Sequence, residues 1–354
     1  MSNYNKARRT GLKIVFENVN ISATINEYLL SFVYTDNADG EADDLQITLQ
    51  DRDNVWIKNW LNKAVENAAM NKGMRIHAAI VTQNWEWDRG KDVELICGDF
   101  EIDSVGASAP PAVITIKGTS LPFGAQIRQT AKNKAWESYT LSAIAEEMAK
   151  ANGMSIMFDS AVNPYYKRVT QSRTSDAAFL NRLCSDAGLS LKATENSLVI
   201  FDQTKYEAME PILTLKYGDG KYTKYKFSSG TADVNYASCR VRYNNPETGE
   251  LISGVAYADD YDAEGENNQQ LERWEKVNDA ADAKNLAEQL LRLHNKFEKS
   301  GSVTMPGNPA ISAGVTMQFE GFGMFSGKYF VQQARHTVGN SGYVTDAEIR
   351  RVGG

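Results

Sequence analysis

The stretch from Val169 to Asp202 constrains the fold more than any other part of the chain. Ser175 or Asp176 can cap a helix, because an oxygen-bearing side chain accepts a hydrogen bond from a free amide of the first turn. Gly188 stands where a left-handed C-terminal cap is needed, and residues 189–201 read as two strands around a polar turn. The residues between the two caps form an apolar stripe at helical spacing: Phe179, Leu180, Leu183, Cys184 and Ala187. The stretch therefore predicts a helix followed by a β-hairpin.

The length and composition predict a soluble protein of several domains. The chain has 354 residues, whereas single cores stop growing at roughly 250–300 residues. Hydrophobic residues make up 42% and charged residues 23%, as in ordinary globular proteins. No apolar run approaches the roughly 20 residues of a membrane helix, and the basic amino terminus lacks an apolar signal core. We expect a protein that folds in a cytoplasm and has no membrane anchor.

The charge and the cysteines exclude further classes of site. The net charge of −7 and the pI near 5.2 argue against stable nucleic-acid binding, which needs clustered Lys and Arg to neutralise phosphates. Cys97, Cys184 and Cys239 are widely spaced, and none has a CxxC partner. Their apolar neighbours predict small buried hydrophobic residues rather than disulfides or zinc ligands.

Residues 1–128 are predicted to form an amino-terminal β-barrel domain. Alternating apolar residues predict strands through residues 12–34, including Ile21 and Ile25, and through residues 45–49. Short strands at even spacing suggest a small barrel, which would leave no open edges. One helix is predicted to begin after Asp53 and to end at Asn71-Lys72-Gly73, with one shared apolar face: Ile57, Leu61, Ala64 and Ala68.

Residues 129–206 are predicted to form a central α/β domain. Residues 128–136 read as a connecting arm, and Thr140 as the cap of a helix that ends at Asn152-Gly153. The apolar face of that helix has four members: Leu141, Ile144, Ala145 and Met148. A short strand at residues 156–158 precedes the helix and hairpin described above.

Residues 207–354 are predicted to form a C-terminal β-barrel domain with an inserted helix at residues 279–299. One face of that helix carries Leu286, Leu290, Leu293 and Phe297. Burying these side chains would contribute roughly 6–12 kcal/mol as an upper bound, so the helix must dock onto another element. The predicted fold class is therefore α+β, mostly β, with two small antiparallel β-barrel modules flanking a central α/β module. The sequence shows no clear internal repeat.

Several of these segments, taken in order, resemble the late control D family of phage tail hubs, which is related to the hub part of type VI secretion spikes. The central helix and hairpin resemble the middle module of that family, and residues 98–104 resemble its first barrel. Further similar segments lie in the last third of the chain: 282–287, 291–292, 295–298, 314–315, 321–323, 327–331, 342–343 and 348–350. Each motif is weak alone, and their order is much more specific.

The resemblance implies a homotrimeric hub in the baseplate of a contractile phage or phage-like tail. Two barrels in each of three subunits would match a sixfold tail tube to a threefold central spike around an axial channel. The implied partners are the tail tube protein, the central spike protein and other baseplate or wedge proteins, assembled in the host cytoplasm. The long C-terminal needle of fused secretion spikes is absent, so a separate spike chain is expected.

An acidic channel would let DNA pass without binding it stably. The acidic segment after Ala258 is a candidate lining for such a channel, and a plain solvated loop is the alternative: Asp259, Asp260, Asp262, Glu264 and Glu266.

No catalytic, cofactor-binding or metal-binding residues are predicted, and no cofactor is implied. His77, His294 and His336 lie far apart in sequence and are interpreted as core or surface residues. The acidic run at residues 36–44 does not match a calcium loop, because Thr35 and Gln46 stand where the first and last ligands belong. It contains Asp36, Asp39, Glu41, Asp43 and Asp44 and is predicted to be a solvated turn.

Two alternatives to a structural hub are a tail-associated cell-wall hydrolase and a carbohydrate-binding tail module. A hydrolase needs two carboxylates across a cleft, and nothing in the sequence aligns pairs such as Asp99 with Glu101 or Asp260 with Asp262 in that way. The tryptophans could stack on sugars, but core packing or a subunit interface explains them equally well. They are Trp56, Trp60, Trp85, Trp87, Trp136 and Trp274.

Overall fold

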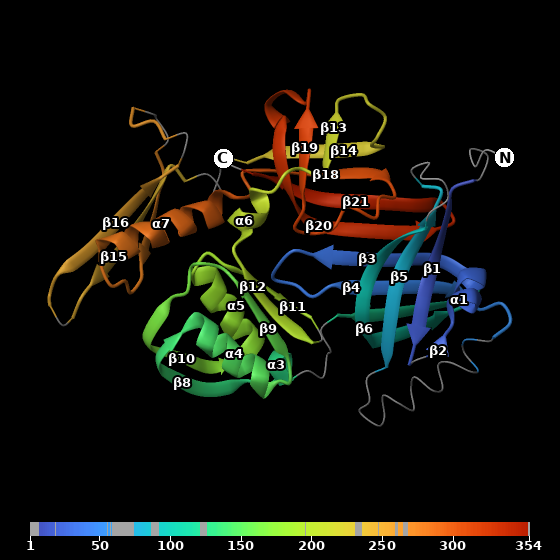
Figure 1. Ribbon diagram of the computed structural model, residues 1–354, viewed down its shortest axis with the longest axis horizontal. Helices are drawn as coiled ribbons and strands as arrows, with labels where there is room; N and C mark the ends of the chain where they lie inside the picture. The colour runs from blue at the N-terminus through green and yellow to red at the C-terminus, as the bar shows by residue number, and fades with distance from the viewer. Residues whose placement is uncertain are drawn as a thin grey trace.

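The structure is a computed structural model in which one large sheet, a compact α/β part and a small outlying sheet are arranged around a common junction (Figure 1). It describes residues 7–17, 19–54, 56, 58, 74–85, 92–120, 126–194, 196–230, 236–246, 248–258, 261–264 and 268–352. Most of the predicted helix after Asp53, including its apolar face, lies outside these residues, as do Trp60 and Trp87. In the part of the chain that is described, no helix is long and apolar enough to cross a membrane.

The amino-terminal strands form one wing of the large sheet. They are β1 (Arg9–Phe16), β2 (Val19–Asn20), β3 (Leu29–Asn37), β4 (Asp44–Gln50), β5 (Arg75–Gln83), β6 (Asp92–Ser108) and β7 (Val113–Thr119). Alternate side chains point into a shared core, in which Ile14, Ile47 and Phe100 are fully buried. Helix α1 (Ser22–Tyr28) corrects the strand predicted there: Ile21 and Ile25 are four residues apart, which is a helical repeat.

The carboxyl-terminal strands extend the same sheet. They are β13 (Leu213–Lys216), β14 (Lys224–Ser229), β18 (Lys299–Pro306), β19 (Thr316–Glu320), β20 (Gly327–Gly339) and β21 (Gly342–Arg351), with a 3-10 turn η3 (Gly323–Phe325). Strand β20 pairs antiparallel with β3, from Gln333 opposite Asn37 to Gly339 opposite Ser31. Among the described residues this makes a sheet of 13 strands, ordered β14-β18-β21-β20-β3-β4-β7-β6-β5-β1-β2, with β19 attached to β20 and β13 attached to β19.

The large sheet confirms a mostly β, α+β fold and corrects the predicted closed barrels. Neither set of strands closes on itself in the described part of the chain. The reason is that one edge of β3 pairs with β20, a strand from the other end of the sequence. A strand has only two edges, and the other edge of β3 pairs with β4.

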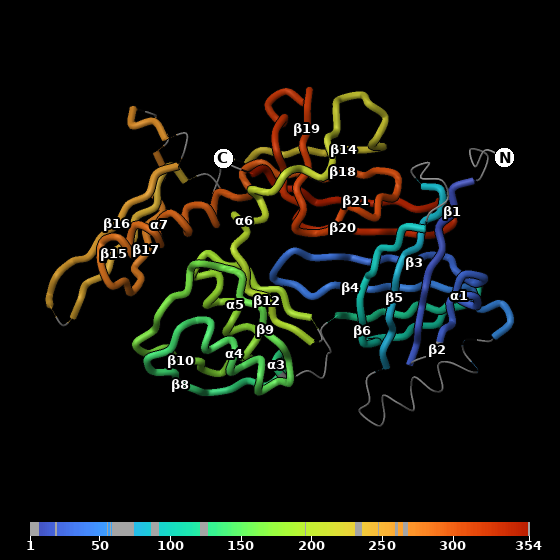
Figure 2. The backbone as a smooth tube through the Cα atoms, in the orientation of Figure 1, coloured from blue at the N-terminus to red at the C-terminus, as the bar shows by residue number. Residues whose placement is uncertain are grey.

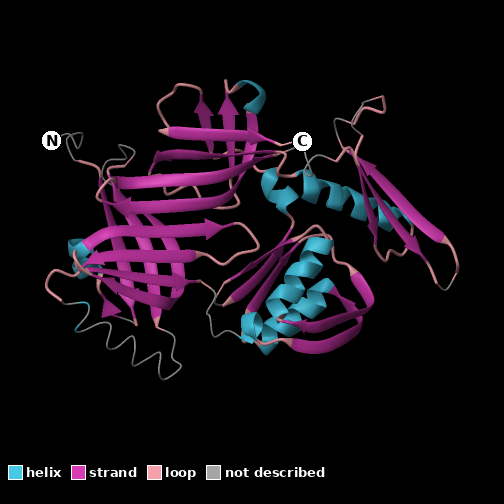
Figure 3. Cartoon of the chain, turned by 180° about the vertical axis from the view of Figure 1, so that it is seen from behind, coloured by secondary structure: helices cyan, strands magenta, loops and turns pink. Residues whose placement is uncertain are grey.

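The central part packs its helices on a small three-stranded sheet (Figure 3). Its elements are α3 (Gln126–Gln129), β8 (Lys132–Thr140), α4 (Leu141–Ala151), β9 (Ser155–Asp159), β10 (Tyr165–Thr174), α5 (Asp176–Asp186), β11 (Ser190–Ala193), β12 (Ser197–Phe201) and α6 (Gln203–Glu207). The predicted helix and hairpin are confirmed: the hydroxyl of Ser175 accepts from the amide of Ala178 at 3.3 Å, and Gly188 has φ +67°. The predicted connecting arm is instead strand β8, paired with β10.

A small sheet and the longest helix among the described residues form an outlying module, hereafter the side module. It contains β15 (Ser238–Asn244), β16 (Leu251–Tyr257), β17 (Gln270–Trp274) and α7 (Ala280–Asn295), with α7 lying along the sheet in Figure 1. Asp279 caps α7 by accepting from the amide of Asp282 at 2.8 Å. The helix ends at Asn295, before the predicted Lys299.

The buried face of α7 differs from the predicted one. The face that packs on the sheet consists of Ala283, Ala287, Leu290 and Leu291, while Phe297 lies beyond the helix and is 43% exposed. Small residues are needed because α7 approaches β16 closely. A Cβ atom on Gly254 would lie 2.3 Å from the backbone nitrogen of Lys284. Leu286 packs only partly against this core, and Leu293 is half-buried.

Four clusters of buried apolar side chains hold the described residues together. One lies in each wing of the large sheet, one in the central part and one in the side module. Cys97, Cys184 and Cys239 are buried in three of them, which confirms their interpretation as small apolar residues. The domain boundaries near residues 128 and 206 stay predictions.

Truncating Leu290 tests whether α7 is held by its apolar face. Leu290 is 9% exposed and packs in the core of the side module. We expect Leu290→Ala to lower the free energy of unfolding by about 2–5 kcal/mol, measured by urea denaturation. Phe297→Ala is the control and should cost about 1 kcal/mol or less, because that ring is largely exposed. Equal denaturation midpoints for Leu290→Ala and the parent chain would contradict the packing described here.

Candidate functional site: a buried polar junction

The wings of the sheet, the central part and α7 meet at a cluster of charged and amide side chains, hereafter the polar junction. In Figures 1 and 2 the β3–β4 hairpin reaches across to the β11–β12 hairpin at this point. The backbone completes the contact, because the amide of Gly40 donates to the carbonyl of Leu191 at 3.2 Å. The junction consists of Asp36, Asn37, Asp39, Asp43, Lys192, Gln203, Glu207, Arg292, Lys296, Gln332 and Arg350.

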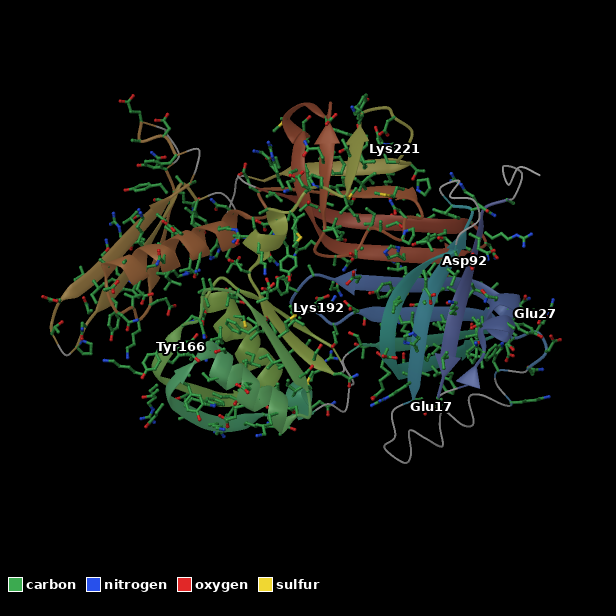
Figure 4. All side chains as sticks on the ribbon, in the orientation of Figure 1. Glu17, Glu27, Asp92, Tyr166, Lys192 and Lys221 are labelled. Atoms are coloured by element: carbon green, nitrogen blue, oxygen red, sulfur yellow. The ribbon has the colours of Figure 1, made fainter. Side chains whose placement is uncertain are left out.

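Lys192 on β11 is the cation of the first half of the junction and is labelled in Figure 4. Its Nζ lies 2.8 Å from Oδ1 of Asp36 and 3.1 Å from Oδ1 of Asp43, and it donates to the carbonyl of Asn37 at 2.9 Å. Asp36 and Asp43 are only 7% and 6% exposed. The β3–β4 hairpin thus contributes two buried carboxylates that share one cation from the central part.

The pKa values of Lys192 and Asp43 are set by different balances of burial and charge. Burial lowers the pKa of Lys192, but the charges and hydrogen bonds of Asp36 and Asp43 outweigh it, so the pKa of Lys192 is raised. Burial raises the pKa of Asp43, and the positive charge of Lys192 only partly offsets it. Asp43 therefore depends on Lys192 to remain ionised where it is buried.

Asp39 at the tip of the hairpin connects three parts of the chain. Its Oδ2 accepts from Ser190 Oγ at 2.8 Å and from Gln203 Nε2 at 2.7 Å, and its Oδ1 accepts from Gln332 Nε2 at 2.7 Å. Lys296 of the segment after α7 lies 3.9 Å from the same carboxylate. One side chain therefore ties the amino-terminal hairpin to the central part and to β20.

Arg350 on β21 extends the network to α6 and α7. Its guanidinium is almost wholly buried, stacks over the ring of Phe330 at 4.6 Å, and donates to Gln332 at 3.0 Å and Gln203 at 2.8 Å. It also donates to Glu207, whose two carboxylate oxygens both accept from Nη2 of Arg292, at 3.0 and 3.1 Å. The carboxylate of Glu207 is thus shared by two arginines from different elements.

The junction overturns the prediction that the acidic run at residues 36–44 is a solvated turn. Asp36 and Asp43 are buried, and Asp39 accepts three hydrogen bonds. The local pattern could not reveal this, because Lys192 lies 156 residues from Asp36 and Gln332 lies 293 residues from Asp39. The only local signal was an unusual density of carboxylates in a short hairpin. Buried carboxylates must be paired with cations, and in this case the cation lies in a distant part of the sequence.

The other singled-out residues are not brought together. His77 is an exposed residue of β5, and its Nδ1 lies 3.0 Å from Oδ1 of Asp99. His294 lies on α7, and His336 is buried in β20. Asp262 and Glu264 are exposed, whereas Asp259, Asp260 and Glu266 lie outside the described residues. Across the described ranges, no group of three or more His, Cys, Asp or Glu side chains is placed to hold a metal ion.

The described tryptophans serve packing in most cases. Trp56 and Trp136 are core residues, and the ring of Trp136 stacks on Phe179 at 5.3 Å. Trp85 joins the two wings of the sheet, since its ring lies 5.5 Å from Tyr343 and its Nε1 donates to the carbonyl of Gly307. Trp274 on β17 is 59% exposed.

The arrangement of side chains in the polar junction is that of a structural contact rather than of a reaction centre. The carboxylates of Asp36, Asp39, Asp43 and Glu207 each accept from a cation or an amide already in place. A buried charge is stable only when it is paired and hydrogen-bonded. The network therefore fixes how the parts sit relative to one another.

Removing the cation of Lys192 tests this role. We expect Lys192→Met to lower the free energy of unfolding by about 3–5 kcal/mol, because two buried carboxylates lose their counter-ion. The matched control is Lys13→Met, which breaks an exposed ion pair with Glu94 and should cost about 1 kcal/mol or less. Urea denaturation compares the two. Adding Asp36→Asn and Asp43→Asn to Lys192→Met should recover part of the loss, and equal midpoints for Lys192→Met and Lys13→Met would refute the assignment.

Known structures share this architecture. A 43 kDa tail protein of prophage MuSo2 from Shewanella oneidensis matches with TM-score 0.68 at 13% identity, over 97% of this chain and 98% of that one. A tail protein from Neisseria meningitidis matches with TM-score 0.70 at 11% identity, over 97% and 96%. The Escherichia coli c3393 protein, a type VI secretion component, matches with TM-score 0.50 at 10% identity, over 92% and 74%. At these identities the matches establish a shared fold.

Sequence comparison identifies the family. Probable baseplate hub proteins of Escherichia phages P2 and 186 are 28% and 26% identical to this chain over 177 and 205 residues. The matches cover 49% and 56% of this chain but only 41% and 48% of those relatives, so less than half of either is matched. The family model for the phage tail baseplate hub (GPD) matches residues 122–342, well over half of the sequence. The resemblance predicted from the ordered motifs is thereby confirmed, and the chain belongs to the phage tail baseplate hub (GPD) family.

Proposed function

We propose that this chain is a structural hub of a phage or phage-like tail baseplate and works within the assembled tail. The observation that carries the proposal is the family match over residues 122–342. The fold supports it, because the pairing of β3 with β20 and the polar junction hold the described parts in one fixed arrangement. A component that passes load between other proteins needs such internal rigidity.

We further propose that three copies surround an axial channel and join a sixfold tail tube to a threefold spike. Each chain presents two β-rich wings in a single sheet, so three chains present six. Closed cyclic symmetry is the common solution for a finite assembly. The net charge of −7 suits a channel that DNA crosses without being retained. The proposed partners are the tail tube, the spike and other baseplate or wedge proteins.

We propose that the hub has no hydrolytic activity of its own. The buried carboxylates of the polar junction already contact cations of the same chain. A glycosidase needs two carboxyl groups free to face a substrate, about 5–10 Å apart across a cleft.

Counting copies tests the proposed symmetry. Co-expression with the spike protein of the same tail should yield a complex that contains three copies of this chain, measured by native mass spectrometry and by cryo-electron microscopy. The spike is included because a hub can remain monomeric until its threefold partner is present. One copy per assembled particle, or six copies per ring, would contradict the proposal.

Zymography tests the absence of hydrolysis. The purified chain should clear neither peptidoglycan nor polysaccharide gels, and a known muramidase on the same gel serves as the positive control. If a cleared band appears and a single Asp or Glu substitution abolishes it while the protein stays folded, the chain is a tail-associated hydrolase instead.

A further inference from the structure

The connection between β13 and β14, together with β14, forms a positively charged projection of the carboxyl-terminal wing, hereafter the basic tip. Residues 216–226 contain four lysines and one aspartate, in a chain whose net charge is −7. Figure 4 labels Lys221 on this connection. Lys216 pairs with Glu320 at 3.2 Å. The other three lysines are exposed and form no ion pair with a described residue: Lys221, Lys224 and Lys226. These three cations are therefore available to another chain.

Exposed aromatic rings lie beside these lysines. Tyr217 and Tyr225 are 64% and 40% exposed. The ring of Phe322 supports both of them, with centroid distances of 5.6 and 5.3 Å, and itself lies 5.5 Å from the fully buried ring of Phe319. Tyrosine is enriched among the residues that carry most of the binding energy of protein interfaces. The basic tip thus combines free positive charge with tyrosines anchored in the core.

Hydrogen bonds within the connection hold the basic tip in one shape. The carboxylate of Asp219 accepts from the amides of Lys216 and Lys221 at 2.9 and 3.0 Å, and the hydroxyl of Tyr222 accepts from the amide of Gly218 at 2.9 Å. The one acidic side chain of the tip is therefore bound to the backbone of its own loop. A surface that is ordered in advance loses little conformational entropy on binding.

A surface of opposite charge lies at the end of β16, hereafter the acidic patch. Tyr257 and Tyr261 are 56% and 38% exposed, and their rings are 4.5 Å apart. Asp262 and Glu264 are exposed beside them and form no ion pair with a described residue. In Figures 1 and 3 the end of β16 and the β13–β14 connection belong to separate parts of the molecule. The two surfaces of one copy therefore do not meet.

The geometry of β14 favours a protein over a nucleic acid as the occupant of the basic tip. Lysines beside aromatic rings also suit single-stranded nucleic acid. However, Lys224 and Lys226 lie opposite Thr304 and Ser302 in the ladder with β18, one residue to either side of Tyr225. Successive side chains of a strand point to opposite faces, so a strand of nucleic acid stacked on the tyrosine would not reach both lysines. A protein surface that covers the edge of β14 can contact both faces.

We propose that the basic tip of one copy contacts the acidic patch of a neighbouring copy of this chain. This inference rests on the proposed function, in which three copies surround an axis. In such a ring each copy meets its two neighbours through two different surfaces, which must be complementary. The basic tip and the acidic patch meet this condition, because each has two exposed tyrosines and their charges are opposite. Exposed ion pairs add little energy, so the charges orient the contact and the tyrosines supply most of its affinity.

Charge reversal provides the test. The full chain and its variants are each co-expressed with the spike protein of the same tail, and the copies per complex are counted by native mass spectrometry. Lys221→Glu with Lys224→Glu should lower the fraction of complexes with three copies about tenfold, because like charges then face each other. Asp262→Lys with Glu264→Lys should have the same effect. All four substitutions in one chain should restore the complex with three copies, because opposite charges face each other again.

A matched variant controls for the change in net charge. Lys150→Glu with Lys276→Glu makes the same change at exposed positions of α4 and of the segment after β17. It should leave the number of copies unchanged. Urea denaturation midpoints equal to that of the parent chain show that each variant is folded.

The outcomes separate this inference from the proposed function. Three copies with either reversed pair, or a folded chain with all four substitutions that stays monomeric, would overturn the inference alone. Three copies that lose the spike on reversal of Lys221 and Lys224 would assign the basic tip to the spike. Binding of a labelled single-stranded oligonucleotide that the same reversal abolishes would assign it to nucleic acid. One or six copies of the parent chain would contradict the proposed symmetry, and the inference with it.

Discussion

The contact of Lys192 with Asp36 and Asp43 is the constraint on which the arrangement of the parts depends. Asp36 and Asp43 are two buried carboxylates of the β3–β4 hairpin, and the cation that contacts both of them comes from β11 of the central part. Replacing a buried ion pair by apolar residues is often neutral for stability, whereas breaking one is costly. Such a pair therefore contributes more to structural specificity than to stability. The hairpin and β11 fit together at one register, because a shift of one residue would leave charges unpaired.

The seam between β3 and β20 sets the second relation, between the two ends of the chain. Seven residue pairs, from Gln333 opposite Asn37 to Gly339 opposite Ser31, join segments that are some 300 residues apart in sequence. Asp39 lies just beyond this seam and accepts from Gln332 of β20. The ladder and the junction thus reinforce each other, because the pairing of β3 with β20 delivers Asp39 to Gln203 and Ser190 of the central part.

Local signals predicted local structure well and tertiary pairing poorly. The caps at Ser175 and Thr140, the turn at Gly188 and the β11–β12 hairpin follow from short-range chemistry and were correct. The errors at α1 and β8 arose where the sequence pattern fits more than one kind of secondary structure. The error at α7 arose because packing against the neighbouring sheet determines which side of the helix is buried. The polar junction could not be predicted, because its acidic and basic side chains are separated by 85 residues or more and each set alone resembles solvated surface.

The same physics separates the surfaces that close the fold from those left for other proteins. The carboxylates of Asp36, Asp39 and Asp43 are bound by other side chains of the same chain, and β20 pairs with one edge of β3. At β16 the situation differs, because an uncharged strand that packs closely on α7 has one edge that no other described strand covers. An open edge can pair with another chain, whereas the buried carboxylates of the junction already have their partners within this chain.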